Sequence, residues 1–384
     1  MNILFVSDYY PNPKQPQFCI FIQQQAEALI RLGHKVEVIV PISTYSLKEK
    51  INEILLAGIS VFYSEYFTLY KKIYSNIALK RNIKVYEKFF RFEQYDIISI
   101  HMFDEFTLRI FTEIAKNHNN KLVIHYHGLS ILYDYPIPLL ARVLQHRGDR
   151  VLKNLIAKAD AIVGVSNKVC DRAKAVLINK NFFTVYNGVN TELFQPLIIK
   201  NNQKYTIICV ASLKRIKGNQ YLINAVKMLA EKYGDNKIKL FLIGHGPDKE
   251  NLIEQIKNLN MENIVQMIGY IRYEEVAHIM AQGDVFAMPS FYEALGCVYL
   301  EAMACRLPVI ACKYQGIDEI ITDGQNGLLV EPHNTIQIFE KLDYLYQHKD
   351  ISEVIALNGY LTALNRYTWL DSAKSLIEVY QNIV

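Results

Sequence analysis

Residues 285–305, VFAMPSFYEALGCVYLEAMAC, contain a short apolar run, a polar loop and an amphipathic segment in direct succession. The run at 285–288 predicts a buried strand, and the spacing after it predicts a helix that starts near Leu295 and Gly296. The first N–H groups of a helix have no partner within it and attract anions, and open α/β folds bind ligands where their strands end. This stretch therefore predicts an α/β fold with an anion site next to Glu293 and Glu301.

The same alternation of short apolar runs and longer amphipathic segments extends along nearly the whole chain, which is typical of a parallel sheet covered by helices. Ten runs predict buried strands: 3–6, 36–40, 97–100, 122–125 and 161–165 in the first half, and 206–210, 240–243, 285–288, 308–311 and 327–330 in the second. We therefore expect two doubly wound, Rossmann-like domains.

A polar, Asn-rich stretch at 186–196, followed by 200–204, separates the two sets of strands and predicts a linker. The expected domains are residues 1–196 and residues 197–365. The segment 366–384 has apolar residues at helical spacing, and we expect it to form a helix that docks on the first domain. A cleft between the two domains is the expected ligand site.

The composition excludes several classes of protein. The 384 residues are 51% hydrophobic, so each domain can bury a core, and the formal net charge of +4 lacks the excess expected of a nucleic-acid-binding chain. Residues 1–196 carry a net +7 and the rest −3, so the first half is the better partner for an anionic surface. No apolar stretch approaches the roughly 20 residues that cross a bilayer. The start lacks a secretory signal and the six cysteines lack zinc spacing, so we expect a cytoplasmic protein.

The two glutamates allow three interpretations. In the first, Glu301 is a buried carboxylate whose oxygens accept hydrogen bonds from a vicinal diol such as a ribose. In the second, Glu293 and Glu301 are ordinary surface acids of an amphipathic helix. A glycosidase-like pair of acid and nucleophile is the least favoured, because eight residues of helix would separate the two by about 12 Å.

The stretch 210–218 runs from a strand into a cationic loop with Lys214, Arg215 and Lys217, and then into a helix expected at 219–232. Cations at the end of a strand suit a diphosphate and would stabilise the charge that develops on it as a leaving group. The alternative is a solvated basic turn, relaxed by its glycine.

Two further stretches follow predicted strands. Gly244 and Gly246 resemble half a dinucleotide-binding turn without its third glycine, so we expect a tight turn near the cleft and no nicotinamide cofactor. His127 could hydrogen-bond a sugar hydroxyl, or it could be a structural histidine. We expect no metal site, because His125 and His127 are predicted to alternate between the faces of their strand and the chain contains no Asp-x-Asp.

Residues 70–92 carry seven cations and one acid, interleaved with aromatic side chains. Such a helix could lie on an anionic bilayer, with each cation near the surface contributing about 1 kcal/mol. The alternative is an amphipathic helix that packs its aromatic residues inward.

Together, these stretches resemble the family 4 retaining glycosyltransferases, which have the two-domain GT-B fold. The most specific element is Glu293, seven further residues and Glu301, within Pro-Ser-Phe-Tyr-Glu-Ala-Leu-Gly. The other matching elements are 32–36, 159–166, 186–190, 217–218 and 324–330.

The resemblance implies roles for individual residues. Glu301 would hold the ribose of a nucleotide sugar, Lys217 would bind the diphosphate, and His127 would contact the donor sugar. The implied catalytic residues are His127, Glu293 and Lys217. The implied donor-binding residues are Ser212, Arg215, Gly244, Ala294, Leu295, Gly296 and Glu301, of which 294–296 would act through their backbone. Neither a metal nor a cofactor is implied.

The chain departs from the family pattern at four places. Ala211-Ser212-Leu213 stands where Gly-Arg-Leu is usual, so Arg215 is the candidate to replace the missing arginine. The remaining departures are Phe18-Cys19 in place of a glycine pair, Ser130 in place of an acid, and Gln315-Gly316 in place of Gly-Gly before Glu319. None of them removes Glu293, Glu301, Lys217 or His127.

The sequence thus predicts a metal-independent, retaining glycosyltransferase that moves a hexose-type sugar from a UDP or GDP sugar to a glycan or lipid-linked acceptor. Cell-surface polysaccharide biosynthesis is the expected process, with peripheral contact to an anionic membrane through residues 70–92 and no nucleic-acid partner. The alternatives are a nucleotide-sugar epimerase or a phosphorylase on the same fold, and a non-catalytic glycan-binding scaffold.

Overall fold

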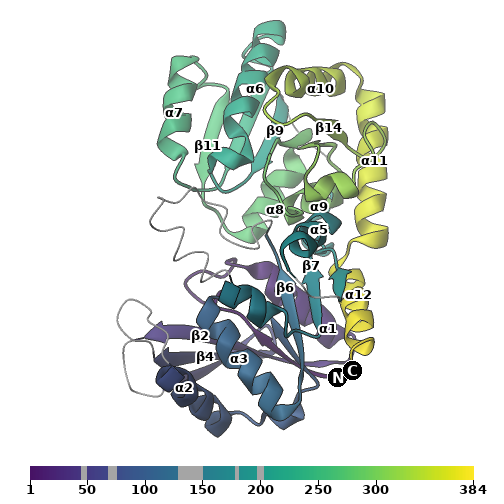
Figure 1. The fold of residues 1–384 in the computed structure, drawn as a ribbon. Helices are drawn as coiled ribbons and strands as arrows, with labels where there is room; N and C mark the ends of the chain where they lie inside the picture. The colour runs from purple at the N-terminus through teal and green to yellow at the C-terminus, as the bar shows by residue number, and fades with distance from the viewer. Residues whose placement is uncertain (45–49, 68–75, 129–149, 178–180, 197–202) are drawn as a thin grey trace. The chain divides into compact units, whose positions relative to one another are not determined.

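The computed structural model describes residues 1–44, 50–67, 76–128, 150–177, 181–196 and 203–384. The chain divides into two compact units (Figure 1). Unit 1 consists of Met1–Tyr186 and Trp369–Val384, and unit 2 consists of Asn187–Thr368. The division falls before the boundary expected at residue 196, so the Asn-rich stretch belongs to unit 2.

Among the described residues, unit 1 forms an eight-stranded sheet in the order β3-β4-β2-β1-β5-β6-β7-β8. Neighbouring strands are parallel, except for the antiparallel pair β3 and β4. The strand bounds are β1 Asn2–Val6, β2 Lys35–Thr44, β3 Ile51–Leu56, β4 Ile59–Phe67, β5 Ile97–Ile100, β6 Lys121–Tyr126, β7 Ala161–Gly164 and β8 Phe182–Thr184. The chain runs outward from β1 in one direction and then from β5 in the other, so the switch point of this sheet lies between β1 and β5.

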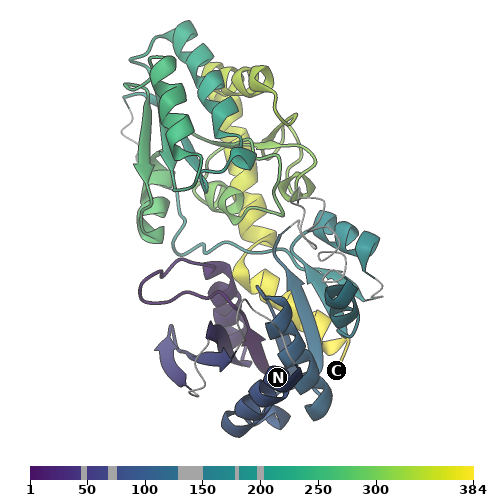
Figure 2. The same cartoon turned by 60° about the vertical axis from the view of Figure 1, so that its left-hand side comes forward.

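The helices of unit 1 cover this sheet. Their bounds are α1 Ile20–Arg31, α2 Asn76–Phe89, η2 Phe92–Gln94, α3 Glu105–His118, α5 Asn167–Val176 and α12 Trp369–Gln381. The C-terminal helix α12 packs beside α1 (Figure 1), and α2 packs beside α3 (Figure 2). Leu376 and Tyr380 of α12 are fully buried in the same core as Ile3 and Phe5 of β1, so the C-terminal helix is part of the unit 1 core.

Among its described residues, unit 2 forms a six-stranded parallel sheet in the order β11-β10-β9-β12-β13-β14. The strands are β9 Tyr205–Val210, β10 Ile238–Ile243, β11 Val265–Gly269, β12 Val285–Met288, β13 Val309–Cys312 and β14 Leu328–Val330. The helices are η3 Arg215–Lys217, α6 Asn219–Tyr233, α7 Lys249–Asn258, α8 Tyr273–Gln282, α9 Cys297–Ala304, η4 Gly316–Glu319, α10 Thr335–Gln347 and α11 Lys349–Arg366. In Figure 1, α10 lies beside α6 at one end of the unit. The switch point lies between β9 and β12.

The prediction of an α/β fold with two Rossmann-like parallel sheets is confirmed. Each of the ten predicted runs overlaps a strand, because strands such as β1, β5 and β12 are buried on both faces and are therefore continuously apolar. Four strands were not predicted: β3, β4, β8 and β11. The first two form a hairpin whose turn residues, Ala57 and Gly58, have φ angles of 50° and 80°.

Candidate functional site

Two loops meet at the switch point of unit 2, where β9 and β12 end. Phe291 donates its backbone N–H to the carbonyl oxygen of Ile216 at 3.0 Å, and the Ser290 hydroxyl donates to the same oxygen at 3.2 Å. Gly218 has a φ of 75°, and a Cβ atom there would lie 2.1 Å from the carbonyl oxygen of Pro289. Only glycine permits both this φ and this close approach, so Gly218 allows the cationic loop to pack against residues 289–296, here called the glutamate loop.

This approach brings Lys217 and Glu293 together. The Lys217 ammonium donates a hydrogen bond to Glu293 Oε2, and the two side chains are only 17% and 14% exposed. An ion pair that is largely shielded from water is stronger than one on the open surface. Lys217 is therefore aimed at the acidic loop, and the interpretation of the loop as a solvated turn is disfavoured.

Contacts from the loop after β13 hold the backbone of Glu293. The Glu293 N–H donates to Gln315 Oε1 at 2.9 Å, and the Gly316 N–H donates to the Glu293 carbonyl at 3.1 Å. Helix α9 then begins at Cys297, after Gly296 in the left-handed region with a φ of 80°. The Gln-Gly departure from the family pattern is thus a structural support of the glutamate loop.

Glu301 lies inside α9 and is buried, with an exposed fraction of 7%. Its Oε1 accepts a hydrogen bond of 2.6 Å from the hydroxyl of Tyr273, the first residue of α8. Burial raises the pKa of Glu301 to about 7, while the Tyr273 hydrogen bond opposes that rise. The interpretation of Glu293 and Glu301 as ordinary surface acids is wrong, because both side chains are shielded and each has a specific partner.

The other predicted donor-binding residues lie in the loops that follow β9, β10 and β12. Ser212 and Arg215 are exposed and belong to the same loop as Lys217. Gly244 follows β10, and its N–H donates to the Gly269 carbonyl at 2.8 Å. Ala294 and Leu295 bury their side chains, which leaves their backbone for the role that the resemblance implies.

Unit 1 presents a different cluster where β5 and β6 end. His101 follows β5 and His127 follows β6, with His101 Nδ1 and His127 Nε2 3.1 Å apart. His125 stacks on His101 with ring centroids 4.2 Å apart. Burial is the main cause that lowers the pKa of all three imidazoles, to about 3 for His127. The cluster is therefore uncharged at neutral pH.

The expectation that His125 and His127 lie on different faces of their strand is wrong. Residues two apart on a strand share a face, and the ligand nitrogens of these two and His101 all lie within 4.8 Å of one another. However, the rings of His101 and His125 stack face to face, with centroids 4.2 Å apart and an interplanar angle of 22°. A metal ion lies in the plane of each imidazole that binds it, and stacked planes do not meet at one point. This arrangement does not fit a metal ion.

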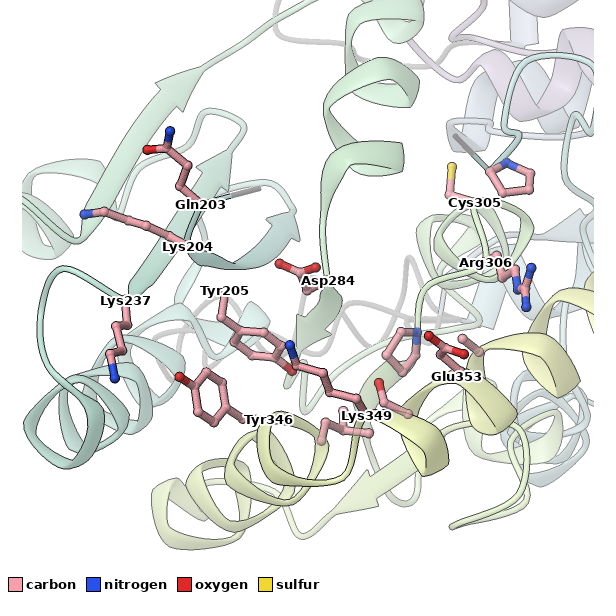
Figure 3. Close-up of a pocket in the computed structure, with 15 residues that line it drawn as sticks. Gln203, Lys204, Tyr205, Lys237, Asp284, Cys305, Arg306, Tyr346, Lys349 and Glu353 are labelled. Carbon is pink, nitrogen blue, oxygen red and sulfur yellow. The ribbon is translucent and has the colours of Figure 1, made fainter. Parts of the chain in front are cut away.

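A cavity of about 860 Å³ opens at the opposite edge of the unit 2 sheet, where β9, β12 and β13 begin (Figure 3). Lys204 and Lys237 lie on one side of it, Arg306 lies on the other, and Lys349 lies between them (Figure 3). None of its lining residues belongs to the loops that carry Lys217 and Glu293. The cavity is therefore separate from the candidate site.

Sequence reasoning missed two residues that contact the predicted ones, His101 and Tyr273. It named Gln315 only as a departure from the family pattern and missed its contact with Glu293. His101 directly follows a predicted strand, as His127 nearly does, and that shared position is a usable signal. Tyr273 lies 28 positions before its partner Glu301, and nothing in its local sequence indicates the contact.

Two family models match the chain. The model described as glycosyl transferases group 1 matches residues 190–362, and the model described as Glycosyltransferase Family 4 matches residues 20–193. Together they cover residues 20–362, which include most of both units. The chain belongs to this family of glycosyltransferases, as the resemblance predicted.

Individual relatives cover much or all of the chain. An uncharacterised glycosyltransferase of Methanocaldococcus jannaschii is 29% identical over 241 residues, which are 62% of this chain and 64% of the relative. The gpi3 subunit of phosphatidylinositol N-acetylglucosaminyltransferase from Schizosaccharomyces pombe is 24% identical over 395 residues, covering 98% of this chain and 80% of the relative. The crystal structure of Anabaena HepE in complex with UDP-glucose has a TM-score of 0.74 at 19% identity and covers 100% of both chains. The chain thus spans less than two thirds of the first relative, and its fold is that of the GT-B glycosyltransferases.

Proposed function

We propose that this chain transfers a hexose-type sugar from a nucleoside diphosphate sugar to a hydroxyl group of a glycan or lipid-linked acceptor, with retention of configuration. One observation carries the proposal: a shielded Lys217, paired with Glu293, stands at the switch point of unit 2 in a loop that packs against the loop leading into α9. An ammonium group and a helix N-terminus are both suited to a diphosphate. Family membership supports the reaction class.

Glu301 is the proposed ribose ligand. Its Oε1 already accepts a hydrogen bond from Tyr273, so Oε2 is the oxygen that remains for the ribose hydroxyls. Two ribose hydroxyls would donate hydrogen bonds to this oxygen, and a hydrogen bond to a carboxylate is stronger than one to a neutral acceptor. We propose a UDP or GDP sugar as donor and favour UDP, since the HepE crystal contains UDP-glucose.

The proposed reaction proceeds on one face of the donor sugar. The acceptor oxygen bonds to C1 while the C1–O bond to the diphosphate breaks, and the acceptor proton passes to the departing phosphate oxygen. Lys217 would leave Glu293 to stabilise the charge that develops on the diphosphate, and Glu293 would turn to the sugar. His127 of unit 1 would donate a hydrogen bond to a sugar hydroxyl. Lys217 and the N-terminus of α9 would neutralise the negative charge of the diphosphate, which is the task of a metal ion in other enzymes. We therefore propose a metal-independent reaction.

The remaining donor contacts are proposed for residues of the loops after β9, β10 and β12. Arg215 is the guanidinium that would replace the family's arginine, whose position is taken by Ser212. Gly244 and the backbone of 294–296 would approach the sugar and the phosphates. Gly296 adopts a left-handed φ, and a Cβ there would lie 2.8 Å from the Tyr299 ring, which favours glycine at this position.

Peripheral membrane contact is proposed for α2. No helix in the described part of the chain is long and apolar enough to cross a membrane. Three aromatic residues of this segment are buried: Tyr86, Phe90 and Phe92. Two apolar residues are exposed, Ile77 with an exposed fraction of 83% and Phe89 with 48%. Four cations of the same segment are also exposed: Lys80, Lys84, Lys88 and Arg91. Residues 70–75 lie outside the described residues. Such a surface suits an anionic leaflet at the cytoplasmic face, where a lipid-linked acceptor for polysaccharide synthesis would be found.

The membrane proposal predicts sedimentation with vesicles of anionic lipid at low salt and none with neutral vesicles. The double variant K84E/K88E should abolish this binding. Charge reversal of Lys227 and Lys257, which lie on helices of unit 2, is the matched control and should leave it intact. Equal binding by both double variants would contradict a role for α2.

Thermal-shift measurements with UDP, GDP and ADP test nucleotide binding first. A ligand present at about 100 times its Kd adds about 2.7 kcal/mol to the stability of the folded state, so one of the three should raise Tm clearly. Incubation of the UDP or GDP sugar with candidate acceptors, with the anomeric configuration of the product read by NMR, then tests transfer and retention. Epimerised sugar from donor alone would favour the epimerase, and no Tm response to any nucleotide would favour the scaffold.

A further inference from the structure

A continuous chain of hydrogen bonds connects the C-terminal helix to His127. The Tyr380 hydroxyl of α12 donates to Ser99 Oγ on β5 at 3.0 Å, and Ser99 Oγ lies 3.3 Å from His101 Nε2. His101 Nδ1 in turn lies 3.1 Å from His127 Nε2. Tyr380, Ser99 and His101 are each 0% exposed, so water does not compete along the chain.

The donor and acceptor roles in this series of hydrogen bonds run in one direction, from Tyr380 to His127. Ser99 Oγ accepts the proton of Tyr380, and a hydroxyl oxygen could accept a second proton from His101 Nε2. In that case the proton of the buried Ser99 hydroxyl would have no acceptor among the described residues. The arrangement that satisfies every buried proton therefore has Ser99 donate to His101 Nε2. A neutral imidazole carries one N–H, so His101 then holds its proton on Nδ1 and donates it to His127 Nε2. His127 must therefore carry its own proton on Nδ1.

The surroundings of His127 agree with this assignment. Burial lowers the pKa values of His101 and His127, so each imidazole is neutral and has only one proton to place. His127 Nδ1 is buried and has no hydrogen-bond partner in the part of the chain that the structure describes. The ring of Phe21 packs 4.7 Å from the His127 ring, which limits rotation of the imidazole. The Nδ1–H is thus the group that a ligand oxygen would satisfy.

We propose that Tyr380, Ser99 and His101 are positioning residues that fix the tautomer of His127, so that its Nδ1–H is presented as a hydrogen-bond donor. The opposite tautomer would present a lone pair and would repel a carbonyl or an ether oxygen. The use of this donor on a sugar hydroxyl rests on the proposed function, whereas the tautomer itself does not.

The tautomer can be measured directly on the full-length protein with ¹⁵N-labelled histidine. Two-bond ¹H–¹⁵N correlations distinguish Nδ1–H from Nε2–H, and the H127Q spectrum assigns the signals of His127. We expect wild-type His127 to be more than nine-tenths Nδ1–H at pH 7.5. Tyr380→Phe and Ser99→Ala should each raise the Nε2–H form to at least about a tenth, because His101 is then free to hold its proton on either nitrogen.

A matched control separates this effect from a general loosening of the core. Tyr86 is another buried tyrosine of unit 1, and its hydroxyl lies 2.7 Å from Ser64 Oγ. Tyr86→Phe should lower Tm about as much as Tyr380→Phe and leave the His127 tautomer unchanged. An Nε2–H tautomer in the wild type, or an unchanged tautomer in both Tyr380→Phe and Ser99→Ala, would overturn the proposal.

Hydrolysis of UDP-glucose by the same variants separates this proposal from the proposed function. Ser99→Ala should lower kcat several-fold in the wild-type background and should have no further effect in the H127Q background. If the tautomer shifts in Ser99→Ala but kcat does not, the assignment of the hydrogen-bond chain stands and the sugar contact of His127 is lost.

Discussion

The two sheets of this protein carry opposite kinds of chemistry at the same structural position. In unit 2, the loops at the switch point hold an ion pair, Lys217 with Glu293, and a second carboxylate on Glu301. In unit 1, the loop after β5, at the switch point, and the end of β6 beside it hold a cluster of three neutral imidazoles. Charged groups at a sheet edge suit an anion such as a diphosphate, whereas neutral imidazoles can only donate or accept hydrogen bonds. The comparison indicates that the topology of a sheet determines where polar side chains gather, and that the charge and burial of those side chains determine which ligands they suit.

Lys217→Ala should have the largest effect. Removing one preorganised charge stabiliser costs about 10²–10³ in kcat, since the diphosphate gains charge as it leaves. Steady-state kinetics with the donor identified by thermal shift would measure this. Lys214→Ala, on the same loop but exposed, is the matched control and should leave kcat within a factor of about two. A change confined to KM in Lys217→Ala would contradict the leaving-group role.

Glu301→Gln should act on binding more than on turnover. A ribose contact is much the same in the ground and transition states, so we expect the donor KM to rise about tenfold with little change in kcat. The amide also removes a buried charge, so the ligand-free variant should have a higher Tm than wild type at pH 8. An unchanged donor KM would speak against ribose binding by Glu301.

Opposite pH responses of the two units should follow from their pKa shifts. Glu301 has its pKa raised to about 7, so the folded state holds a proton that the unfolded state loses, and unit 2 gains stability as the pH falls from 7.5 to 5.5. The three histidines have lowered pKa values, so the unfolded state takes up protons that the folded state refuses, and unit 1 loses stability over the same range.

Hydrogen exchange followed by mass spectrometry at pH 7.5 and 5.5, corrected for intrinsic exchange rates, would measure this. Protection of β9 and β12 relative to β5 and β6 should rise at least about tenfold at the lower pH, since one pKa unit corresponds to about 1.4 kcal/mol. Glu301→Gln should remove the response of unit 2 alone. Parallel changes in both units would contradict the comparison.

Arg215→Ala should give the smallest effect. Arg215 is exposed, and screening by water weakens its attraction for a diphosphate, so we expect the donor KM to rise only about two- to fivefold. Raising the salt concentration should reduce the difference from wild type. A loss of activity as large as that of Lys217→Ala would show that the exposed guanidinium, rather than the shielded ammonium, is the main diphosphate ligand.

Much of the fold could be predicted because central parallel strands are apolar on both faces. The sequence of β12, Val-Phe-Ala-Met, is a short apolar run between Gly283 and Pro289, which favours a buried strand over a helix. The β3–β4 hairpin could not be predicted in the same way, because Ile51–Leu56 exposes Asn52 and Glu53 at the edge of the sheet and its turn is Ala-Gly rather than Asn-Gly. An edge strand pairs with one neighbouring strand and has its other edge exposed to water, so its apolar pattern is weaker than that of a central strand.

The contacts of the candidate site also fall into those that could be predicted from the sequence and those that could not. That Lys217 and Glu293 meet could be expected because each follows a strand of the same parallel sheet. The contacts of Tyr273 with Glu301 and of Tyr380 with Ser99 could not, since they join segments whose meeting depends on how helices pack. Sequence position predicts which loops share an edge, and tertiary packing decides which side chains support them.

The central claim is that the ammonium of Lys217 binds a diphosphate. Isothermal titration calorimetry of UDP and of uridine, with wild type and with Lys217→Ala, tests it most directly. The account predicts that wild type binds UDP at least about tenfold more tightly than uridine and that Lys217→Ala loses most of this difference while keeping its affinity for uridine. Equal preference for UDP in both proteins would contradict it.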